Sequence, residues 1–361
     1  MASVKNIAIR VDASSQIGTG HFMRCLTLAE ELKKKGSYIK FICRHLPDYL
    51  QSMLVEKEID FSRLNYPNNE FNLDELDHSN WLGVSQFLDS QDTIHALTDR
   101  SWDWLVVDHY ALDYRWENEL KVVVKSILVI DDLADRTHNC DILLDQNYYS
   151  DMGTRYNGKI PKHCQILLGP MHALLREEFR QIRSHVKIRN HKLSNILIFF
   201  GGVDVENFTG LTIDALSNSA FAGLRINVVL GAQHPYLDEI KLLCLKNGYI
   251  CHIQTKQMAE LMLGAELAIG AGGSATWERC CMGLPALIVS LANNQKRIAQ
   301  GIDILQAGKF LDGKAKDVIN EIVELVQFYS NNQDDLEMLS KNAYAATDGM
   351  GVIRLGNLLL N

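Results

Sequence analysis

Short apolar runs alternate with helix-like segments along the whole chain, and this alternation constrains the fold more than any other feature. Residues 6–11 and 38–43 are predicted as buried strands, and residues 20–35 between them carry apolar side chains at helical spacing. Further short apolar runs of this half lie at 104–108, 126–130, 141–144 and 164–168. Strands that alternate with helices predict a parallel sheet covered by helices on both faces.

The same pattern restarts after residue 193. Strands are predicted at 195–200, 224–230, 249–253, 266–269 and 286–290, with helices near 206–217, after Pro235, at 257–264 and from 315 onward. The polar and basic segment 180–193 is predicted as a linker. A chain of 361 residues is longer than one hydrophobic core usually serves. We therefore expect an α/β protein of two Rossmann-like domains, residues 1–190 and 191–361, which face each other across a cleft.

Charge and cysteine content narrow the class of protein. Lys plus Arg is 36 and Asp plus Glu is 44, a net charge of -8 that disfavours nucleic-acid binding but permits a small anion held by backbone amides. The sequence contains no run of eighteen consecutive apolar residues, so no membrane span is predicted, and the N-terminus does not resemble a signal peptide. The eight cysteines lack zinc-site spacing, so they are predicted to be reduced thiols of a cytoplasmic protein.

The first candidate site is the loop Gly18-Thr19-Gly20-His21, between the first strand and the first helix. Glycines let the backbone approach a ligand, and amides at a helix start attract anions. The spacing is not the GxGxxG of dinucleotide sites, so no NAD cofactor is expected. His21 at a helix N-terminus favours the neutral imidazole that a general base needs. The alternative is a tight turn with a surface histidine.

The second candidate site lies in residues 270–278, again between a strand and a helix. Gly272, Gly273 and Ser274 are predicted to place amides and a hydroxyl against a phosphate, and Glu278 to accept hydrogen bonds from a ribose diol. The alternative is a glycine turn with a serine N-cap and a helix-favouring glutamate. Two glycine-rich loops, one in each half, favour a functional role.

Two more signals lie in the second half. Gly201-Gly202 follows the strand at 195–200, with Asp204 as a ligand-facing group or a helix cap. Asn294-Gln295 follows the strand at 286–290, and its amides are predicted to contact a phosphate, a base or a sugar, unless Asn294 only caps a helix.

Polar groups also follow strands of the first half. His109 and Tyr110 are predicted to face the ligand, because the ends of parallel strands line ligand sites. Asp131-Asp132 is predicted as a solvated turn. Tryptophans predicted to serve packing rather than base stacking are Trp81, Trp102, Trp104 and Trp116.

Several motifs together resemble one enzyme family. They are residues 12–24 (DASSQIGTGHFMR), 107–113 (VDHYALD), 131–147 (DDLADRTHNCDILLDQN), 200–204 (FGGVD) and 270–285 (GAGGSATWERCCMGLP). The chain resembles the UDP-2,4-diacetamido-2,4,6-trideoxy-β-L-altropyranose hydrolases of pseudaminic acid biosynthesis. That family is in turn similar to the UDP-GlcNAc-using glycosyltransferase of peptidoglycan synthesis, which has the two-domain glycosyltransferase-B fold.

The resemblance implies an activity and a set of site residues. The enzyme would hydrolyse the anomeric bond of the UDP-sugar and release UDP and the free sugar, a precursor of flagellin or surface glycans, with His21 as catalytic residue and no metal or cofactor. The ribose-binding glutamate maps to Glu278. The substrate-binding residues expected in all are Gly18, Thr19, Gly20, Arg24, His109, Tyr110, Gly202, Gly272, Gly273, Ser274, Glu278, Asn294 and Gln295.

The expected mechanism is attack by water with inversion. His21 takes a proton from the water, and backbone amides of the second domain hold the UDP leaving group. The alternatives are a UDP-sugar glycosyltransferase of the same fold and a nucleotide-sugar-binding protein without activity. Residues 57–100 match no motif of the family and are the candidate region for sugar-specific contacts.

Overall fold

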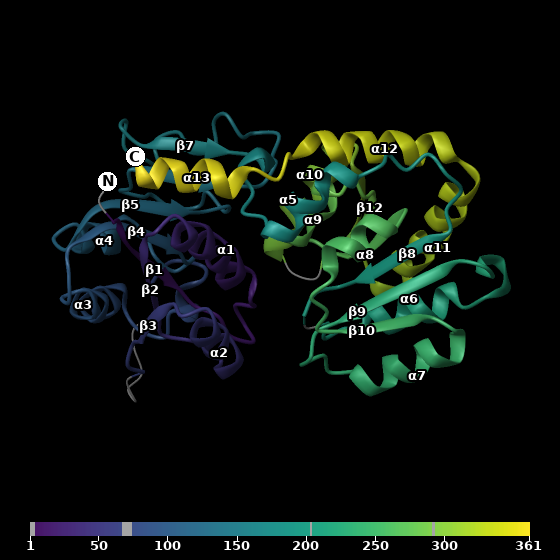
Figure 1. The fold of residues 1–361 in the computed structure, drawn as a ribbon, viewed down its shortest axis with the longest axis horizontal. Coiled ribbons are helices and arrows are strands. Elements are labelled where there is room, and N and C mark those ends of the chain that lie inside the picture. The colour runs from purple at the N-terminus through teal and green to yellow at the C-terminus, as the bar shows by residue number, and fades with distance from the viewer. Residues whose placement is uncertain (1–3, 67–73, 203, 291–292) are drawn as a thin grey trace. The chain divides into compact units, whose positions relative to one another are not determined.

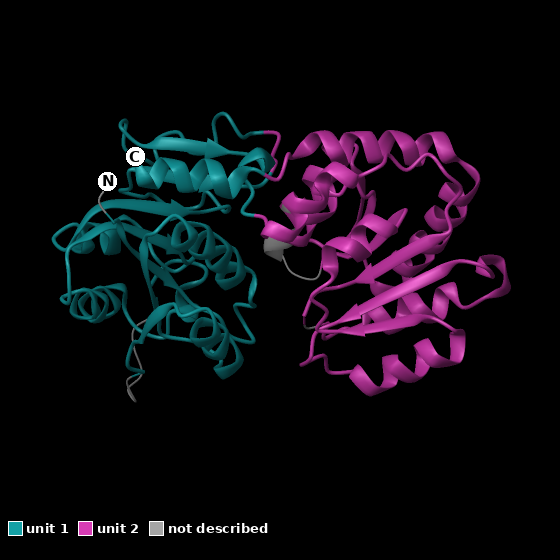
Figure 2. Cartoon of the chain, in the orientation of Figure 1, with its two compact units in different colours: residues 1–147, 151–174, 350–361 teal, residues 148–150, 175–349 magenta. Residues whose placement is uncertain are grey.

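The computed structural model describes residues 4–66, 74–202, 204–290 and 293–361 (Figure 1). The chain divides into two compact units (Figure 2). Unit 1 comprises residues 1–147, 151–174 and 350–361, and unit 2 comprises residues 148–150 and 175–349.

Unit 1 contains a parallel sheet of seven strands in the order β3-β2-β1-β4-β5-β6-β7. Its strands are β1 (Asn6–Val11), β2 (Tyr38–Cys43), β3 (Asp60–Arg63), β4 (Trp102–Asp108), β5 (Val124–Ile130), β6 (Ile142–Asp145) and β7 (Gln165–Leu168). Its helices are α1 (Gly20–Lys34), α2 (Asp48–Glu56), η1 (Ser79–Trp81), α3 (Gln86–Ala96), α4 (Tyr114–Leu120), η2 (Pro170–His172) and α13 (Gly351–Leu360). The strand order reverses between β1 and β4, and ligands of open α/β sheets bind beyond the carboxyl ends at such a point.

Unit 2 repeats this design with six parallel strands in the order β10-β9-β8-β11-β12-β13. Its strands are β8 (Asn195–Phe199), β9 (Arg225–Leu230), β10 (Ile250–Ile253), β11 (Leu267–Ala271), β12 (Ala286–Val289) and β13 (Gly308–Leu311). Its helices are α5 (Glu177–Ile182), η3 (Arg183–His185), α6 (Phe208–Leu216), η4 (Ser219–Phe221), α7 (Leu237–Asn247), α8 (Met258–Gly264), α9 (Ala275–Cys281), α10 (Asn293–Ile304), α11 (Ala315–Asn331) and α12 (Gln333–Ala346). The reversal of strand order lies between β8 and β11.

The expected α/β class with two Rossmann-like sheets is confirmed. Strands β3 and β13 were not predicted, and both are four-residue strands at the edge of their sheet. An edge strand packs on one neighbour only, so its sequence carries a weaker apolar signal than a central strand. Strand β1 shows the contrast, since five of its six residues are buried.

The boundary between the units lies at residue 174 rather than at residue 190. The segment predicted as a linker is anchored in unit 2 by Arg189, which is 5% exposed. Its guanidinium donates to the backbone carbonyls of Ala265 at 3.1 Å and Met262 at 2.9 Å. A basic residue reads as solvated in a sequence, but this one satisfies carbonyl groups inside the fold.

The C-terminal helix α13 belongs to unit 1, although it was expected with the second domain (Figure 2). Val352, Leu355 and Leu359 of α13 are buried in the same core cluster as residues of α1. Lys35, just after α1, donates to Asn357 at 2.6 Å. The apolar face of α13 was visible as helical periodicity, but periodicity does not specify which sheet a helix covers.

Candidate active site

The GxGH loop places His21 at the carboxyl end of β1. Gly18 has a φ of +78°, and its amide donates to the carbonyl of Ser14 at 2.8 Å, which turns the chain sharply before α1. Thr19 precedes the helix without a side-chain cap, and a Cβ added to Gly20 would meet no atom within 4 Å. His21 therefore lies in the first turn of α1, behind a loop whose backbone is accessible.

The imidazole of His21 pairs with Asp108 at the end of the neighbouring strand β4. His21 Nδ1 lies 2.5 Å from Asp108 Oδ1, and the register that aligns Val11 with Asp108 sets this position. Burial favours the protonated acid, but the Arg24 guanidinium and His21 outweigh burial and hold the pKa of Asp108 below its usual value. An ionised carboxylate only accepts hydrogen bonds, so Nδ1 carries the proton.

This pairing leaves Nε2 as the nitrogen of His21 that can accept a proton from a ligand or a water. No hydrogen bond to Nε2 forms within the described residues, and the His21 side chain remains 10% exposed. The arrangement is that of a general base oriented by a carboxylate.

Arg24 lies one helical turn after His21 and holds the same carboxylate. Its Nε donates to Asp108 Oδ2 at 2.6 Å and its Nη2 to Oδ1 at 2.7 Å, a bidentate pair. Its Nη1 donates to Asp132 Oδ2 at 3.0 Å. Arg24 was predicted to bind substrate, and its contacts here are with Asp108, which pairs with His21, and with Asp132.

Tyr110 lies against His21 and extends the network. The two ring centroids are 4.6 Å apart with an interplanar angle of 85°. The Tyr110 hydroxyl donates to Asp132 Oδ1, and Asn147 Nδ2 donates to Asp132 Oδ2 at 3.1 Å. Burial and the neighbouring Asp132 raise the pKa of Tyr110 well above its usual value, so the hydroxyl stays protonated.

The prediction that Asp131-Asp132 is a solvated turn was wrong. Asp131 is fully buried and Asp132 is 6% exposed. Asp131 lies 3.0 Å from Arg136 Nη1 and accepts the amide of Ala134 at 3.0 Å. Burial favours the protonated acid, but Arg136 outweighs it and holds the pKa of Asp131 well below the usual value. The pair is therefore part of a buried charge network.

His109 lies against Asp12 and not against His21. Its Nε2 lies 3.2 Å from Asp12 Oδ2, and its Nδ1 accepts the amide of Ala111 at 3.1 Å. Burial lowers the pKa of His109 although Asp12 acts in the opposite direction. The structure thus joins Tyr110 to His21 and joins His109, the preceding residue, to Asp12.

The second glycine loop connects β11 to α9. Gly273 has a φ of +117°, a backbone conformation that favours glycine, and a Cβ there would meet no atom within 4 Å. Ser274 is exposed and forms no side-chain cap with α9, so the alternative prediction of a serine cap is not realised. Gly272 donates its amide to Val289 at 3.2 Å. The loop thus presents glycine backbone and a serine hydroxyl.

Glu278 lies within α9 and is engaged by an arginine. Arg176 Nε donates to Glu278 Oε1 at 3.0 Å, and Arg176 Nη1 lies 2.6 Å from Glu178 Oε1. The Glu278 side chain is 13% exposed. Its carboxylate is therefore fixed in direction by Arg176 before any ligand binds.

Gly202 is exposed in the loop between β8 and α6. The N-cap of α6 is Asn207, which accepts the amide of Gly210, and Asp204 also accepts amides of the first turn. The Asp204 carboxylate accepts the amides of Phe208 at 3.0 Å and Thr209 at 2.7 Å, so it satisfies amides at the start of the helix without being its N-cap residue. Asn294 and Gln295 lie in α10, and their side chains lie outside the described residues.

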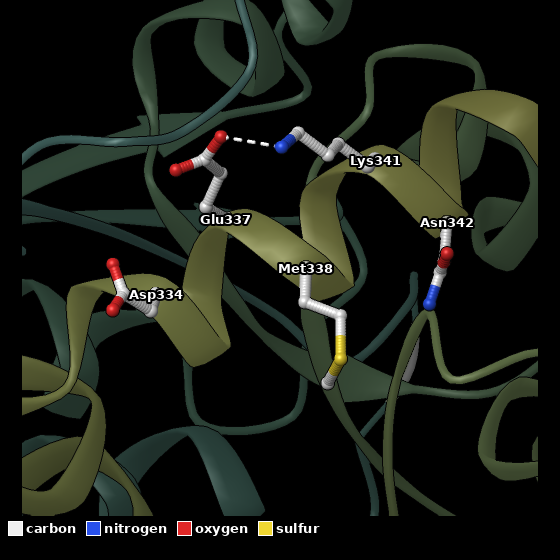
Figure 3. A pocket seen from close by; sticks show the side chains of 5 residues that line it. All are labelled: Asp334, Glu337, Met338, Lys341 and Asn342. Carbon is white, nitrogen blue, oxygen red and sulfur yellow. Dashed lines mark ion pairs between the residues drawn. The ribbon is translucent and has the colours of Figure 1, made fainter.

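A shallow hollow of about 300 Å³ lies on one face of α12 (Figure 3). It is lined by Asp334, Glu337, Met338, Lys341 and Asn342, all on that helix, and Glu337 pairs with Lys341 at 2.6 Å. None of the predicted site residues lines it, so it is separate from the candidate site.

Within the described part of the chain, no group of three or more His, Cys, Asp or Glu side chains has an arrangement that would hold a metal ion. The same residues include no helix with the length and apolar character needed to cross a membrane. All eight cysteines are free thiols.

Solved structures define the class of fold. The MurG structure of Acinetobacter baumannii matches with a TM-score of 0.63 at 12% identity, covering 98% of this chain and 99% of that chain. The spinosyn rhamnosyltransferase SpnG complexed with thymidine diphosphate matches with a TM-score of 0.59 at 14% identity, covering 98% and 99%. These likenesses confirm the glycosyltransferase-B fold.

Curated relatives confirm the resemblance seen in the motifs. The chain is 27% identical to the UDP-2,4-diacetamido-2,4,6-trideoxy-beta-L-altropyranose hydrolase of Campylobacter jejuni, over 71% of this chain and 81% of the hydrolase. It is 27% identical to the spore coat polysaccharide biosynthesis protein SpsG of Bacillus subtilis, over 58% of this chain and 62% of that protein. No protein-family model matches the chain.

Proposed function

We propose that this chain is an enzyme that handles nucleotide sugars, and specifically a hydrolase of the anomeric C–O bond of UDP-2,4-diacetamido-2,4,6-trideoxy-β-L-altrose. The observation that carries the proposal is the His21–Asp108 pair at 2.5 Å, which leaves Nε2 of His21 as an available base. The similarity to the Campylobacter hydrolase supports the choice of substrate. In this account the free sugar that is released serves pseudaminic acid biosynthesis.

The residues of unit 1 supply the proton transfer. Water loses its proton to His21 Nε2 as its oxygen bonds to the anomeric carbon, and the bond from that carbon to the UDP oxygen breaks. Asp108 stabilises the imidazolium that forms, and Arg24 keeps Asp108 ionised. General-base catalysis of this kind contributes about 10²–10⁴-fold to the rate. Attack from the face opposite UDP inverts the anomeric centre.

The residues of unit 2 supply the leaving-group site. Gly273 and Ser274 present backbone amides and a hydroxyl to the diphosphate, at the start of α9. The Gly272 amide donates to the Val289 carbonyl, so Gly272 contributes only the close approach of its backbone. Glu278, held by Arg176, accepts hydrogen bonds from the ribose hydroxyls. Gly202, Asn294 and Gln295 remain further candidates for contacts to UDP.

A second candidate function is a UDP-sugar glycosyltransferase. It is favoured by the fold that the chain shares with structures such as the spinosyn rhamnosyltransferase. The two functions differ only in what attacks the anomeric carbon, a water or an acceptor hydroxyl, and the same base serves both.

The test is anomeric-proton NMR of the purified protein with the UDP-linked diacetamido sugar, without metal or acceptor, and with UDP-GlcNAc as control. We expect UDP and the free sugar from the first substrate only. The variant His21→Leu should lose turnover and retain UDP binding by calorimetry. Turnover only after an acceptor is added would establish the transferase instead, and full activity of His21→Leu would remove the proposed base.

A further inference from the structure

Three aromatic rings next to His21 take no part in the proton transfer. The rings of Trp81 and Tyr110 are stacked with centroids 5.4 Å apart at 26°. His78 packs edge-on against both, at 4.6 Å from Trp81 and 5.2 Å from Tyr110. The Trp81 centroid lies 6.3 Å from that of His21. Trp81 comes from residues 57–100, where the motifs of the resembling family are absent.

The chain holds Trp81 firmly in this place. Leu82 and Val84 directly after it are 1% and 4% exposed and belong to the core of unit 1. Gly83 between them has a φ of +73°, and Ser85 caps α3 by accepting the amide of Leu88 at 3.2 Å. A large apolar ring on such an anchored segment is expected in the core, yet Trp81 remains half-buried.

The surroundings of Trp81 suit a neutral ligand better than a phosphate. Arg136, whose guanidinium lies 5.8 Å from the Tyr110 ring, is paired with Asp131 at 3.0 Å and Asp135 at 2.8 Å. Burial lowers the pKa of His78, so its ring is neutral near pH 7. The Arg136 guanidinium beside these rings is already paired and the His78 ring is neutral, so the aromatic group of His78, Trp81 and Tyr110 favours a neutral ligand over a diphosphate.

The distance to His21 fits the sugar rather than the nucleotide. In the proposed reaction the attacking water lies about 3 Å from His21 Nε2, and the anomeric carbon lies about 3 Å beyond the water. The anomeric carbon therefore lies about 6 Å from Nε2. The ring centroid of Trp81 lies at a similar distance, 6.3 Å, from that of His21. Carbohydrate C–H groups carry partial positive charge and pack on the negative face of an aromatic ring.

We propose that Trp81 is a specificity-determining residue that packs its ring against the apolar C–H face of the sugar. The sugar it selects is a deoxy hexose with few hydroxyls, because a methyl group or bare C–H face packs on indole and a hydroxylated face loses hydrogen bonds to water there. This inference rests on the proposed function, and it names the residue that selects the sugar. Trp81 does not take part in the proton transfer.

The test compares Trp81→Ala, Trp81→Phe and the control Trp104→Phe, a half-buried tryptophan of the same unit that packs on the core. We expect Trp81→Ala to raise KM for the UDP-sugar about tenfold, with kcat within about threefold, because an aromatic contact contributes on this scale. The inhibition constant of UDP alone should not change, since UDP lacks the diacetamido sugar that Trp81 contacts. Trp81→Phe should lie within about threefold of the unchanged protein in KM, as should Trp104→Phe.

Two results would overturn the proposal. A fall in kcat at constant KM would mean that Trp81 only supports His21 through Tyr110. An equal weakening of UDP and UDP-sugar would place Trp81 at the nucleotide. Thermal melting verifies folding, and Trp81→Leu, with the same expected rise in KM, replaces the alanine variant if that variant does not fold.

Failure of the proposed hydrolysis is distinguishable from failure of this inference. If the unchanged protein releases no UDP, the hydrolase proposal fails, and calorimetric affinities for UDP-sugar and UDP then test Trp81 alone. If Trp81→Ala binds the UDP-sugar more weakly than the unchanged protein does, while the two bind UDP equally, the sugar contact of Trp81 is supported. Equal affinity of the two proteins for the UDP-sugar contradicts that contact.

Discussion

The glycine-rich loops of the two units follow the same turn from strand to helix but are backed by different groups. Behind the loop of unit 1, His21 contacts Asp108 and Arg24, and the network continues to Asp132 and Tyr110. Behind the loop of unit 2, Glu278 of α9 contacts Arg176, and Arg279 of the same helix donates to the backbone carbonyls of Ala271 and Phe199. A proton transfer needs side chains fixed in position and charge state, whereas a phosphate can be held by backbone amides.

Burying the charged groups behind the loop of unit 1 has a free-energy cost. Asp108 is 1% exposed and Arg24 is 6% exposed, and removing both charges from water is costly unless every lone pair and proton finds a partner. The bidentate contact and the contact to Asp132 provide those partners. Removing one member of the network therefore affects stability as well as chemistry, and the loop of unit 2 should respond mainly in affinity.

The largest expected effect is that of Asp108→Asn on turnover. The amide would donate to Nδ1 and place the proton of His21 on Nε2, where the base is needed. We expect kcat to fall about 10³-fold, with UDP affinity unchanged, measured by steady-state kinetics and calorimetry. Asp103→Asn on the same strand, a half-buried residue paired with Lys125, is the matched control and should keep its activity. Activity of Asp108→Asn near that of the control would contradict the assigned orientation of His21.

The next effect concerns the pH dependence of stability in unit 1. Burial favours neutral His138, but Glu117 at 2.6 Å outweighs burial and raises the pKa of His138 to about 9. A pKa above the unfolded value of about 6.5 stabilises the fold below pH 6.5 and loses this contribution as pH rises through 9.

We expect the free energy of unfolding to fall by up to roughly 3 kcal/mol between pH 6.5 and 9 because of this group. Urea unfolding followed by tryptophan fluorescence measures it, since four of the five tryptophans lie in unit 1. His138→Gln should flatten the dependence of the free energy of unfolding on pH. The control is His163→Gln, which should leave that dependence unchanged because the His163 side chain is 60% exposed. An unchanged slope in His138→Gln would show that this buried pair does not set the stability of unit 1.

A smaller effect is expected at the loop of unit 2. Gly273→Ala places a Cβ on a backbone with φ of +117°, and although there is space for it, the conformation costs about 1–2 kcal/mol and the loop should shift. UDP affinity measured by calorimetry should fall about tenfold. Gly153→Ala, in an exposed turn with room for a Cβ, is the control. Unchanged UDP affinity in Gly273→Ala would argue against diphosphate binding at this loop.

The smallest effect is that of Glu278→Gln. The amide keeps one acceptor oxygen but weakens the charge-assisted contacts, so UDP affinity should fall about threefold to tenfold with kcat retained. Calorimetry with UDP, uracil and inorganic pyrophosphate separates the loss of the ribose contact from a general loss of affinity. An equal loss of diphosphate affinity would indicate that Glu278 acts through the shape of the loop.

The sequence predicted the sheets and the loop of His21 because both signals are local. Apolar runs between helical segments locate the strands, and glycine followed by histidine at a strand end locates the turn. Asp108 was not predicted as a site residue, although its neighbours were. Side chains alternate across a strand, and only the pairing of β4 with β1 shows that Asp108, not His109, reaches His21.

The buried aspartates show the same limit more strongly. Asp132 is paired with Arg24, 108 positions earlier in the chain, and nothing in the local pattern of residues 131–132 indicates that contact. The attachment of α13 to unit 1 is likewise a long-range contact. Trp81 was predicted as packing, and its place beside His21 depends on the path of a segment that matches no family motif.

The most direct test of the central claim is hydrolysis of the UDP-linked diacetamido sugar in ¹⁸O-enriched water, with mass spectrometry of both products. Attack by water on the anomeric carbon, activated by His21, predicts that the label appears in the free sugar and that UDP remains unlabelled. Label in UDP would mean that water attacks phosphorus, and the account of His21 as a base at the anomeric carbon would be contradicted.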